Sequence, residues 1–510
     1  MEVMVRAVRG EARARLVLEL EDAEKRGASR HKGLPKAASD LVRRAREERV
    51  FRGRNGEVTT LLLSDRSALK TLVLLGLGSR KRSSLDSFRR AFGSFARQAP
   101  PGEIRLDLSD SALRDAAKSL GWERLTRAIV EGALLGAYRY EEFKSAKSSS
   151  AAKRGAKKKG APSKLVLEAD ALSAPDARRA RRGAELGQAA AEAIAFARDL
   201  GNTPANELSP AALAARARAM ARRHGLTCRV LDESALRRES MGAMLAVAQG
   251  SARAPRLIIV EHRPRAARRT LVLIGKAVTF DAGGLSIKPA QGLQDMKFDM
   301  AGGAAVLGAM QLIAKLAPRV RVVALIPAAD NVIGEKAYRP GDVLRSKSGK
   351  TIEIINTDAE GRLLLADTIT YARRFDPDAV VDIATLTGAV VIALGSHISG
   401  LFSNDDKLAA AIERSAETSG ERLWELPLFP EAYEAIKSQV ADVKNSAGRE
   451  AAASTAAAFV GAFAEGLRWA HIDIGGTAWT QRTRGEVTTG ATGVGVRLLG
   501  DLAESFEKEV

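Results

Sequence analysis

Three stretches of the sequence set charged side chains among apolar residues and glycines. The first, GKAVTFDAGGLSIK (275–288), directly follows the apolar run TLVLI. Lys276, Asp281 and Lys288 are therefore expected at and beyond the carboxyl end of a buried strand. Open α/β sheets bind their ligands at that end of the strands. These charged groups indicate a chemical site rather than a solvated surface.

The other two stretches supply further carboxylates and no histidine. MKFDMAGGAAV places Asp299 just before a predicted helix that starts with small residues. NTDAEGRLLLADT places Asp358 and Glu360 in the loop after the apolar run IEII. Arg362 then falls at the start of the next helix. Together the residues singled out in the three stretches supply four carboxylates, two lysines and an arginine.

Four carboxylates that converge in one place repel one another unless cations join them. Two divalent ions would balance that charge, and ions about 3.5–4 Å apart are typical of two-metal hydrolytic sites. Oxygen-rich coordination favours hard or borderline ions such as Mn²⁺, Mg²⁺ or Zn²⁺. A lysine can join such a shell only as the neutral amine, and neighbouring dications lower its pKa enough to allow this.

The motif NTDAEGRL (356–363) resembles the signature of the leucyl aminopeptidase (cytosol aminopeptidase) family. The GKAVTFDAGGLSIK and MKFDM segments fall at the expected places upstream of it. NTPANELSP (202–210), ATLTGA (384–389) and HIDIGGTAW (471–479) resemble other segments of the same catalytic domain. The resemblance covers nearly all of residues 195–500, whereas the first third of the chain is similar only in size, position and α/β character.

The resemblance implies a metal-dependent aminopeptidase with two divalent ions per subunit, Mn²⁺ or Zn²⁺. One ion would be held by a lysine and three carboxylates, namely Lys276, Asp281, Asp299 and Glu360. The second would be held by Asp281, Asp358 and Glu360, with the main-chain carbonyl of Asp358 completing its shell. The two ions would activate the water that attacks the peptide bond.

The same resemblance implies the remaining roles in the site. Lys288 would polarise the scissile carbonyl and stabilise the developing oxyanion. Arg362 would hold a bicarbonate ion, which acts as the general base and takes the proton from the water. The free α-amine of the peptide would bind one metal, so only the N-terminal residue would be released, with leucine and other apolar residues favoured. The side-chain pocket would be lined by Met296, Thr385, Gly388, Gly475 and Ala478.

The pattern of elements predicts two α/β domains. A smaller N-terminal domain over 1–172, with a basic flexible loop near 144–164, precedes a connecting helix and a catalytic domain over 173–510. The catalytic domain is expected to have a mixed, largely parallel sheet flanked by helices, because buried strand runs alternate with helix-length segments. Expected strands are Val58–Leu63, Leu72–Leu75, Leu165–Glu168, Arg256–Val260, Thr270–Ile274, Val320–Ile326 and Ala379–Ile383, and expected helices are Ala38–Arg49, Ser109–Leu120 and Pro175–Leu200.

The charge is concentrated in the first third of the chain. The formal net charge is +19, and residues 1–170 hold 37 basic and 22 acidic residues. The stretch 144–164 has eight basic residues and no acidic one. This excess suits phosphates and leaves open an alternative, a DNA-binding accessory or regulatory protein of the same family, with or without peptidase activity. The complete set of predicted ligands favours the enzyme, because a binding protein has no need of them.

Composition excludes several other classes. The single cysteine, Cys228, rules out a disulfide scaffold and a cysteine-rich zinc site. No run of about 18 apolar residues is present, so no membrane-spanning helix is expected. The first residues show no secretory signal, and a cytoplasmic location is predicted. The resemblance adds a homohexamer as the expected assembly and peptides as substrates.

Overall fold

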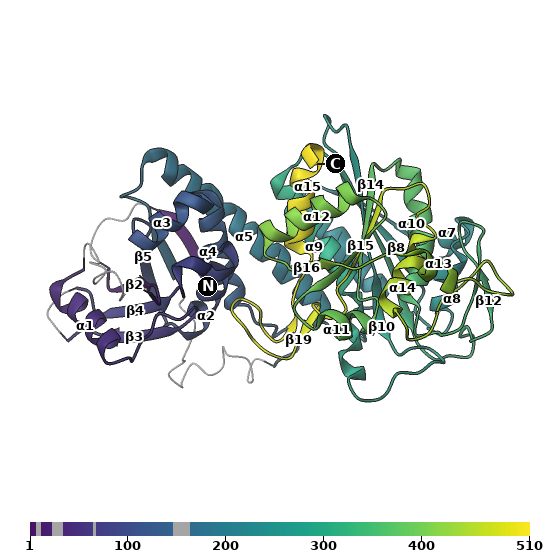
Figure 1. Ribbon diagram of the computed structural model, residues 1–510, viewed down its shortest axis with the longest axis horizontal. Helices are drawn as coiled ribbons and strands as arrows, with labels where there is room; N and C mark the ends of the chain where they lie inside the picture. Colours follow the sequence, from purple (N-terminus) through teal and green to yellow (C-terminus); the bar gives the residue numbers. More distant parts are fainter. Residues whose placement is uncertain (7–11, 23–33, 65–67, 146–163, 510) are drawn as a thin grey trace. The chain divides into compact units, whose positions relative to one another are not determined.

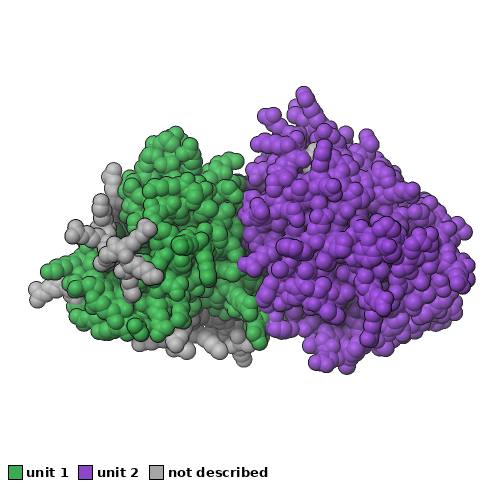
Figure 2. Space-filling view, in the orientation of Figure 1, with its two compact units in different colours: residues 1–192, 482–489 green, residues 193–481, 490–510 purple. Residues whose placement is uncertain are grey.

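The computed structural model describes residues 1–6, 12–22, 34–64, 68–145 and 164–509. The chain forms two compact units (Figures 1 and 2). The first contains residues 1–192 with 482–489, and the second contains 193–481 with 490–510. The domain boundary expected after residue 172 stays a prediction. The basic stretch 144–164 lies almost entirely outside the described residues.

A long helix, α5 (Ala174–Asn202), runs from the first unit into the second. It corresponds to the connecting helix expected over Pro175–Leu200. The Arg97 side chain donates a hydrogen bond to the Gly485 carbonyl. The late segment 482–489 thereby becomes part of the first unit.

The first unit is built on a six-stranded sheet in the order β1-β6-β5-β2-β4-β3. All pairs are parallel except β3 with β4. The expected strands in this part of the chain are present as β3, β4 and β6, and β1, β2 and β5 are additional. The strands are β1 (Glu2–Arg6), β2 (Ala14–Glu19), β3 (Val58–Leu62), β4 (Thr71–Gly76), β5 (Glu103–Asp107) and β6 (Lys164–Glu168).

Two hydrophobic cores hold this sheet between helices. Leu16, Leu18, Val73 and Leu75 pack with the phenylalanines of α2 in one core, whereas Val17 and other residues of the opposite face pack with α1. The alternation follows from the period of two in a strand. The helices are α1 (Lys36–Glu47), α2 (Leu85–Gln98), α3 (Ser111–Leu120) and α4 (Trp122–Gly136), with a short 3-10 turn η2 (Arg80–Arg82).

The second unit is built on a nine-stranded sheet in the order β16-β15-β18-β14-β9-β11-β8-β7, with β10 paired to β11. The strands from β18 to β11 are parallel to one another, and β10 is parallel to β11. Antiparallel pairs lie toward both edges. This confirms the expected mixed, largely parallel sheet. The strands are β7 (Thr227–Leu231), β8 (Arg256–His262), β9 (Thr270–Gly275), β10 (Ala277–Asp281), β11 (Arg321–Asn331), β14 (Ala379–Ala384), β15 (Ser399–Ser403), β16 (Leu423–Glu425) and β18 (Trp469–Asp473).

Helices cover both faces of this sheet (Figure 1). α6, α9, α12 and α15 pack on one face, and α8, α10, α13 and α14 lie on the other. The helices are α6 (Pro210–Arg223), α7 (Glu233–Arg238), α8 (Gly242–Ala248), α9 (Ala301–Leu316), α10 (Gly361–Ala372), α11 (Gly388–Leu394), α12 (Asp406–Ser419), α13 (Pro430–Ala435), α14 (Ala452–Gly461) and α15 (Val496–Glu509), with 3-10 segments η3 (Leu293–Met300) and η4 (Arg373–Phe375).

Small additional strands complete the second unit. They are β12 (Val343–Arg345), β13 (Thr351–Glu353), β17 (Val443–Lys444), β19 (Trp479–Thr480) and β20 (Gly490–Ala491). Within the described part of the chain, no helix is long and apolar enough to cross a membrane.

Candidate active site

The predicted ligands come from separate segments that meet where parallel strands of the larger sheet end. Lys276 lies between β9 and β10, and Asp281 is the last residue of β10. Asp299 lies in η3, just before α9. Asp358 lies in the loop that leads to α10, and Glu360 is the N-cap residue of that helix. The structure brings all five side chains together.

Lys276 links two of the carboxylates in the interior. Its ammonium nitrogen Nζ lies 2.8 Å from Asp299 Oδ2 and 2.8 Å from Glu360 Oε1. It also donates a hydrogen bond of 2.9 Å to the Thr385 carbonyl. Burial alone would lower the pKa of Lys276, but the charges of Asp299 and Glu360 overcome this and raise the pKa above its ordinary value. Lys276 is therefore an ammonium ion in the metal-free protein.

Lys288 links the other two carboxylates nearer the solvent. Its Nζ lies 2.9 Å from Asp281 Oδ2 and also forms an ion pair with Asp358. The side chains of Lys288 and Asp358 are 21% and 31% exposed, whereas that of Asp281 is 3% exposed. Carboxylate oxygens of Asp281, Asp358 and Glu360 all lie within 4.8 Å of one another. This spacing would let one cation contact all three.

The four carboxylates carry more negative charge than the two lysines neutralise. Burial, followed by the charge of Asp281, raises the pKa of Glu360 to about 8. Burial likewise raises the pKa of Asp299 to about 6, against the opposing charge of Lys276. The pKa of Asp358 is raised by burial and by Asp281. Burial is the main cause of each shift, and the negative charge of Asp281 adds to it.

Several carboxylate oxygens of the site lack hydrogen-bond partners, and this indicates whether metal ions would fit there. Both carboxylate oxygens of Glu360, with Asp299 Oδ2 and Asp358 Oδ1, are buried and accept no hydrogen bond of suitable geometry from any described residue. The nearby lysine ammonium groups contribute charge without that geometry. Buried polar atoms normally have partners, and hard or borderline dications take carboxylate oxygens as ligands. The residues therefore fit divalent metal ions.

Neutral residues next to the cluster hold its ligands in place. Asn331, the last residue of β11, donates hydrogen bonds to Asp281 Oδ1 at 2.8 Å and to the Thr357 carbonyl at 3.0 Å. The Tyr338 hydroxyl donates to the same Thr357 carbonyl at 2.7 Å. The Thr357 hydroxyl in turn donates to the Gly283 carbonyl at 2.6 Å. This network fixes the loop of Asp358 against the end of β10.

Two glycines allow the backbone to approach the site closely. Gly283 has a φ of 86°, which favours glycine. Its amide donates to Asp281 Oδ1 at 2.9 Å. A Cβ atom on Gly361 would lie 2.5 Å from Lys276 Cε and 2.7 Å from its Nζ. The glycine of the motif NTDAEGRL thus leaves the space that the Lys276 side chain fills.

Arg362 lies in the first turn of α10 and is 8% exposed. Its Nη1 donates a hydrogen bond of 2.7 Å to the Asn445 carbonyl. Its Nε is buried and has no hydrogen-bond partner among the described residues. Burial lowers the pKa of Arg362 to about 10, against the opposing charge of Glu360. The guanidinium is still charged at neutral pH and keeps a donor for an acidic or anionic partner.

Three of the predicted pocket residues lie just beyond the carboxyl ends of the neighbouring strands β14 and β18. Thr385 follows β14, Gly388 begins α11, and Gly475 follows β18. The Thr385 hydroxyl donates a hydrogen bond to Asp299 Oδ1 at 2.6 Å, a contact that the sequence did not reveal. Met296 lies on η3, the segment that also carries Asp299. Ala478 is 1% exposed, so its methyl group is covered by protein.

Sequence reasoning missed Asn331 and Asn445. Asn331 is the final residue of the long apolar run ending in PAADN, and a polar residue at that end of a buried strand was a usable signal. Asn445 accepts the amide of Ile355 at 2.8 Å and donates to the Asn356 carbonyl at 2.7 Å. It comes from a segment far along the chain, and no local pattern marked it.

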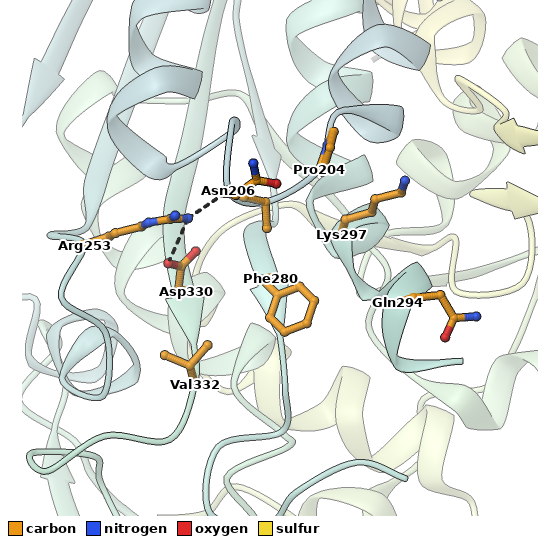
Figure 3. A pocket seen from close by; sticks show the side chains of 9 residues that line it. Pro204, Asn206, Arg253, Phe280, Gln294, Lys297, Asp330 and Val332 are labelled. Carbon is orange, nitrogen blue, oxygen red and sulfur yellow. Dashed lines mark hydrogen bonds and ion pairs between the residues drawn. The ribbon is translucent and has the colours of Figure 1, made fainter. Parts of the chain in front are cut away.

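A separate cavity of about 480 Å³ lies beside β10, which contributes Phe280 to its lining (Figure 3). Arg253 crosses one wall, where its Nη1 donates to the Ala205 carbonyl at 2.5 Å and lies 3.9 Å from Asp330 Oδ2. None of the predicted ligands lines this cavity, so it is distinct from the carboxylate cluster. It is lined by Pro204, Ala205, Asn206, Arg253, Phe280, Gln294, Lys297, Asp330 and Val332.

Comparison with known proteins agrees with this arrangement. The family model described as "Cytosol aminopeptidase family, catalytic domain" matches residues 195–500, and the corresponding N-terminal domain matches residues 16–147. A probable cytosol aminopeptidase of Roseiflexus castenholzii is 46% identical over 445 residues, which are 86% of this chain and 88% of the relative. Another, from Syntrophotalea carbinolica, is 45% identical over 466 residues, which are 90% of each chain.

A solved structure matches both units of the chain. The bottromycin maturation enzyme BotP in complex with Mn gives a TM-score of 0.83 at 34% identity and covers 98% of this chain and 100% of that chain. The fold and the carboxylate cluster thus define a metal-dependent hydrolase that acts on peptides. The chain belongs to the cytosol aminopeptidase family and is a leucyl aminopeptidase-type metallo-exopeptidase. Nothing in these matches supports the DNA-binding alternative.

Proposed function

We propose that the enzyme releases N-terminal amino acids, leucine and other apolar residues above all, with a dinuclear metal centre at the carboxylate cluster. The observation that carries this proposal is the convergence of four carboxylates, three of which (Asp299, Asp358 and Glu360) have buried oxygens without a hydrogen-bond partner among the described residues. The ligands of the proposed centre are Lys276, Asp281, Asp299, Asp358 and Glu360. The bound ions would supply Lewis acidity and an activated water.

The two proposed ions have different protein environments. The deeper site would use Lys276 and Asp299, with Asp281 and Glu360 shared between the ions. The outer site would use Asp358 with the two shared carboxylates, and it is the more exposed half of the cluster. Mn²⁺ and Zn²⁺ are the proposed metals, and the relative BotP was solved in complex with Mn. Lys276 would have to lose a proton to coordinate, because its pKa is raised in the metal-free protein.

Lys288 and Arg362 are the proposed catalytic groups outside the metal shells. Lys288 is the exposed ammonium of the site, so a metal that replaces it between Asp281 and Asp358 would free it to donate to the carbonyl oxygen of the substrate. Arg362 keeps a buried donor without a partner in the described chain, and this suits a bound anion such as bicarbonate. A bicarbonate held there would accept a proton from the attacking water.

The remaining parts of the proposal rest on the family and the pocket segments. Met296, Thr385, Gly388, Gly475 and Ala478 are proposed to surround the side chain of the N-terminal residue. We also propose a homohexamer, which the family resemblance implies. A cytoplasmic location is proposed in keeping with the name cytosol aminopeptidase that the relatives carry.

A paired-substrate assay tests the aminopeptidase chemistry. If a metal and the nearby carboxylates bind the α-amine, an N-acetylated peptide should not be cleaved. Acetylation removes the charge and the lone pair, yet leaves nearly the same apolar surface for the pocket. A leucine-initiated tripeptide and its N-acetyl form would be incubated with chelated protein to which Mn²⁺, Zn²⁺ or Mg²⁺ has been added back, and the products would be separated chromatographically.

The expected result is stepwise release from the free N-terminus only, and only with metal present. Comparable cleavage of both peptides would refute an exopeptidase that recognises the amine. The role of the carboxylate cluster in metal dependence is tested with Glu360→Gln, and Asp367→Asn is the matched control. Asp367 is a fully buried carboxylate on the same helix as Glu360, where it accepts the amides of Met244 at 2.9 Å and Lys347 at 2.7 Å. Only Glu360→Gln should abolish the metal-dependent reaction.

A further inference from the structure

Asp473 is the last residue of strand β18. The proposed pocket segments begin just beyond the ends of β18 and of its neighbour β14. Strand β18 runs parallel to β14, and Asp473 pairs in register with Ala384, the last residue of β14. Beyond this pair, one chain continues into Thr385–Gly388 and the other into Gly475. Asp473 is 1% exposed and is neither a predicted ligand nor a predicted pocket residue. Its buried carboxylate therefore needs another explanation.

The carboxylate of Asp473 bonds to both segments at once. Its Oδ1 accepts the amides of Leu386 at 3.1 Å and Gly475 at 3.0 Å, with a longer contact of 3.5 Å to the Thr387 amide. Its Oδ2 accepts the Thr387 hydroxyl at 2.7 Å. One side chain thus satisfies backbone donors from two strands that are nearly ninety residues apart in sequence. Without it these partly buried donors would lose their acceptor and would have to find water instead.

The two segments also touch each other directly. A Cβ atom on Gly475 would lie 2.5 Å from the Thr387 carbonyl oxygen and 3.2 Å from Asp473 Oδ1. The Thr387 hydroxyl accepts the amide of Val390 at 3.1 Å and so caps α11. The position of Asp473 therefore sets both the gap between the pocket segments and the start of α11.

The same loop reaches the metal cluster through its first residue. Thr385 precedes Leu386, its carbonyl accepts Lys276 Nζ at 2.9 Å, and its hydroxyl donates to Asp299 Oδ1 at 2.6 Å. These contacts hold Thr385 from the cluster side, whereas Asp473 holds Leu386 and Thr387 from the pocket side. The loop is thus fixed at both ends by separate groups, so loss of Asp473 should loosen the pocket before it loosens the metal ligands.

We propose that Asp473 is a positioning residue that sets the shape of the pocket for the N-terminal side chain of the substrate. The proposal rests on the proposed function, because the pocket segments are assigned there. Asp473 acts through Leu386, Thr387 and Gly475 and does not contact substrate. Its role is to set which N-terminal side chains the pocket accepts. A pocket wall displaced by a fraction of an ångström loses contacts with the branched side chain of leucine, whereas the methyl group of alanine makes few contacts to lose.

The test compares leucine amide and alanine amide in the metal-loaded enzyme. In Asp473→Ala, the ratio of kcat/KM for leucine to that for alanine should fall by about tenfold, the discrimination that one or two methylenes provide in a well-formed pocket. Most of the change should appear in KM for leucine, with bound metal per chain unchanged. Asp473→Asn should restore most of the ratio, because its amide oxygen can still accept the backbone amides.

Asp382→Ala is the matched control. Asp382 is an equally buried carboxylate on the neighbouring strand β14, where it accepts Trp469 Nε1 at 2.7 Å and contacts His471 Nδ1 at 2.5 Å. Its truncation should lower stability and leave the leucine-to-alanine ratio unchanged. An unchanged ratio in Asp473→Ala, or an equal fall in Asp382→Ala, would overturn the proposal.

A second variant decides the matter if Asp473→Ala does not fold. Thr387→Val removes the bond to Asp473 Oδ2 together with the cap on the Val390 amide, and leaves the amides of Leu386 and Gly475 with their acceptor. The ratio should fall by about threefold, and no change would refute the role of Asp473. The wild-type protein separates this result from the proposed function itself. If it hydrolyses neither amide with any metal, the aminopeptidase assignment of the site fails and not merely the role of Asp473.

Discussion

Replacement of Glu360 by glutamine should make the metal-free protein less sensitive to pH. Glu360 is 1% exposed, and burial with the charge of Asp281 raises its pKa to about 8 from an ordinary value of 4.5. Between about pH 4.5 and about pH 8, the folded chain therefore keeps a proton on Glu360 that the unfolded chain has already released. Stability must then fall as the pH rises from about 4.5 to about 8.

The size of this effect follows from the shift. A pKa difference of about 3.5 units at about 1.36 kcal/mol per unit gives about 5 kcal/mol as the upper bound for Glu360 alone. Glutamine is neutral, has nearly the same shape and does not titrate. Metal-free Glu360→Gln should match the wild type near pH 5, where Glu360 is protonated, and exceed it in stability by a few kcal/mol near pH 9.

The assay is urea unfolding of chelated protein at pH 5, 7 and 9, repeated with Mn²⁺ added. Asp367→Asn is the control, because burial raises the pKa of Asp367 to about 7 and this residue lies outside the carboxylate cluster. Both variants should lose part of the pH dependence, but only Glu360→Gln should lose the stabilisation by Mn²⁺. If Glu360→Gln keeps the full pH slope of the wild type, the electrostatic description of the site is wrong.

The remaining predictions separate metal ligands from catalytic groups. Asp281→Ala and Asp358→Ala should abolish hydrolysis and lower the metal content measured by elemental analysis, and two ions still bound to folded Asp281→Ala would contradict its assignment as a shared ligand. Lys288→Ala and Arg362→Ala should keep their metal and lose about 10²–10³ in kcat, the usual loss for one oxyanion donor. A parent rate of amide hydrolysis in either variant would exclude that role.

Part of the site was predictable because parallel strands place their carboxyl ends together. This rule accounts for Lys276 and Asp281, at the ends of β9 and β10, but not for Asp358, because the run IEII before it contributes to β13 of the separate three-stranded sheet. The place of Asp358 in the site was expected from the family resemblance of its motif. The order of the strands did not follow from the sequence. β14 lies between β9 and β18 and brings Thr385 to Lys276 across more than a hundred residues, and no local pattern encodes such a pairing.

Elements of the first unit were harder to recognise. Strands β1 and β2 carry charged residues within or beside them, as in EVMVR and ARLVLE, and this breaks the simple apolar runs used to find strands. Helix α2 had a usable signal in Ser84, whose side chain accepts the Ser87 amide at 3.2 Å in a capping box. Its arginines interrupt the apolar pattern, although its three phenylalanines lie on one face and pack into the core of that unit.

The two lysines of the site contact the same carboxyl groups that are proposed to bind metal. Lys276 and Lys288 each contact two acidic side chains, so the four carboxyl groups stay assembled around two ammonium ions. Their environments differ, since the side chain of Lys276 is 3% exposed and that of Lys288 is 21% exposed. A buried lysine beside metals can serve as a neutral ligand, whereas the more exposed ammonium can turn toward a substrate. The proposed division into one ligand lysine and one catalytic lysine, which the family resemblance implies, agrees with this difference in burial.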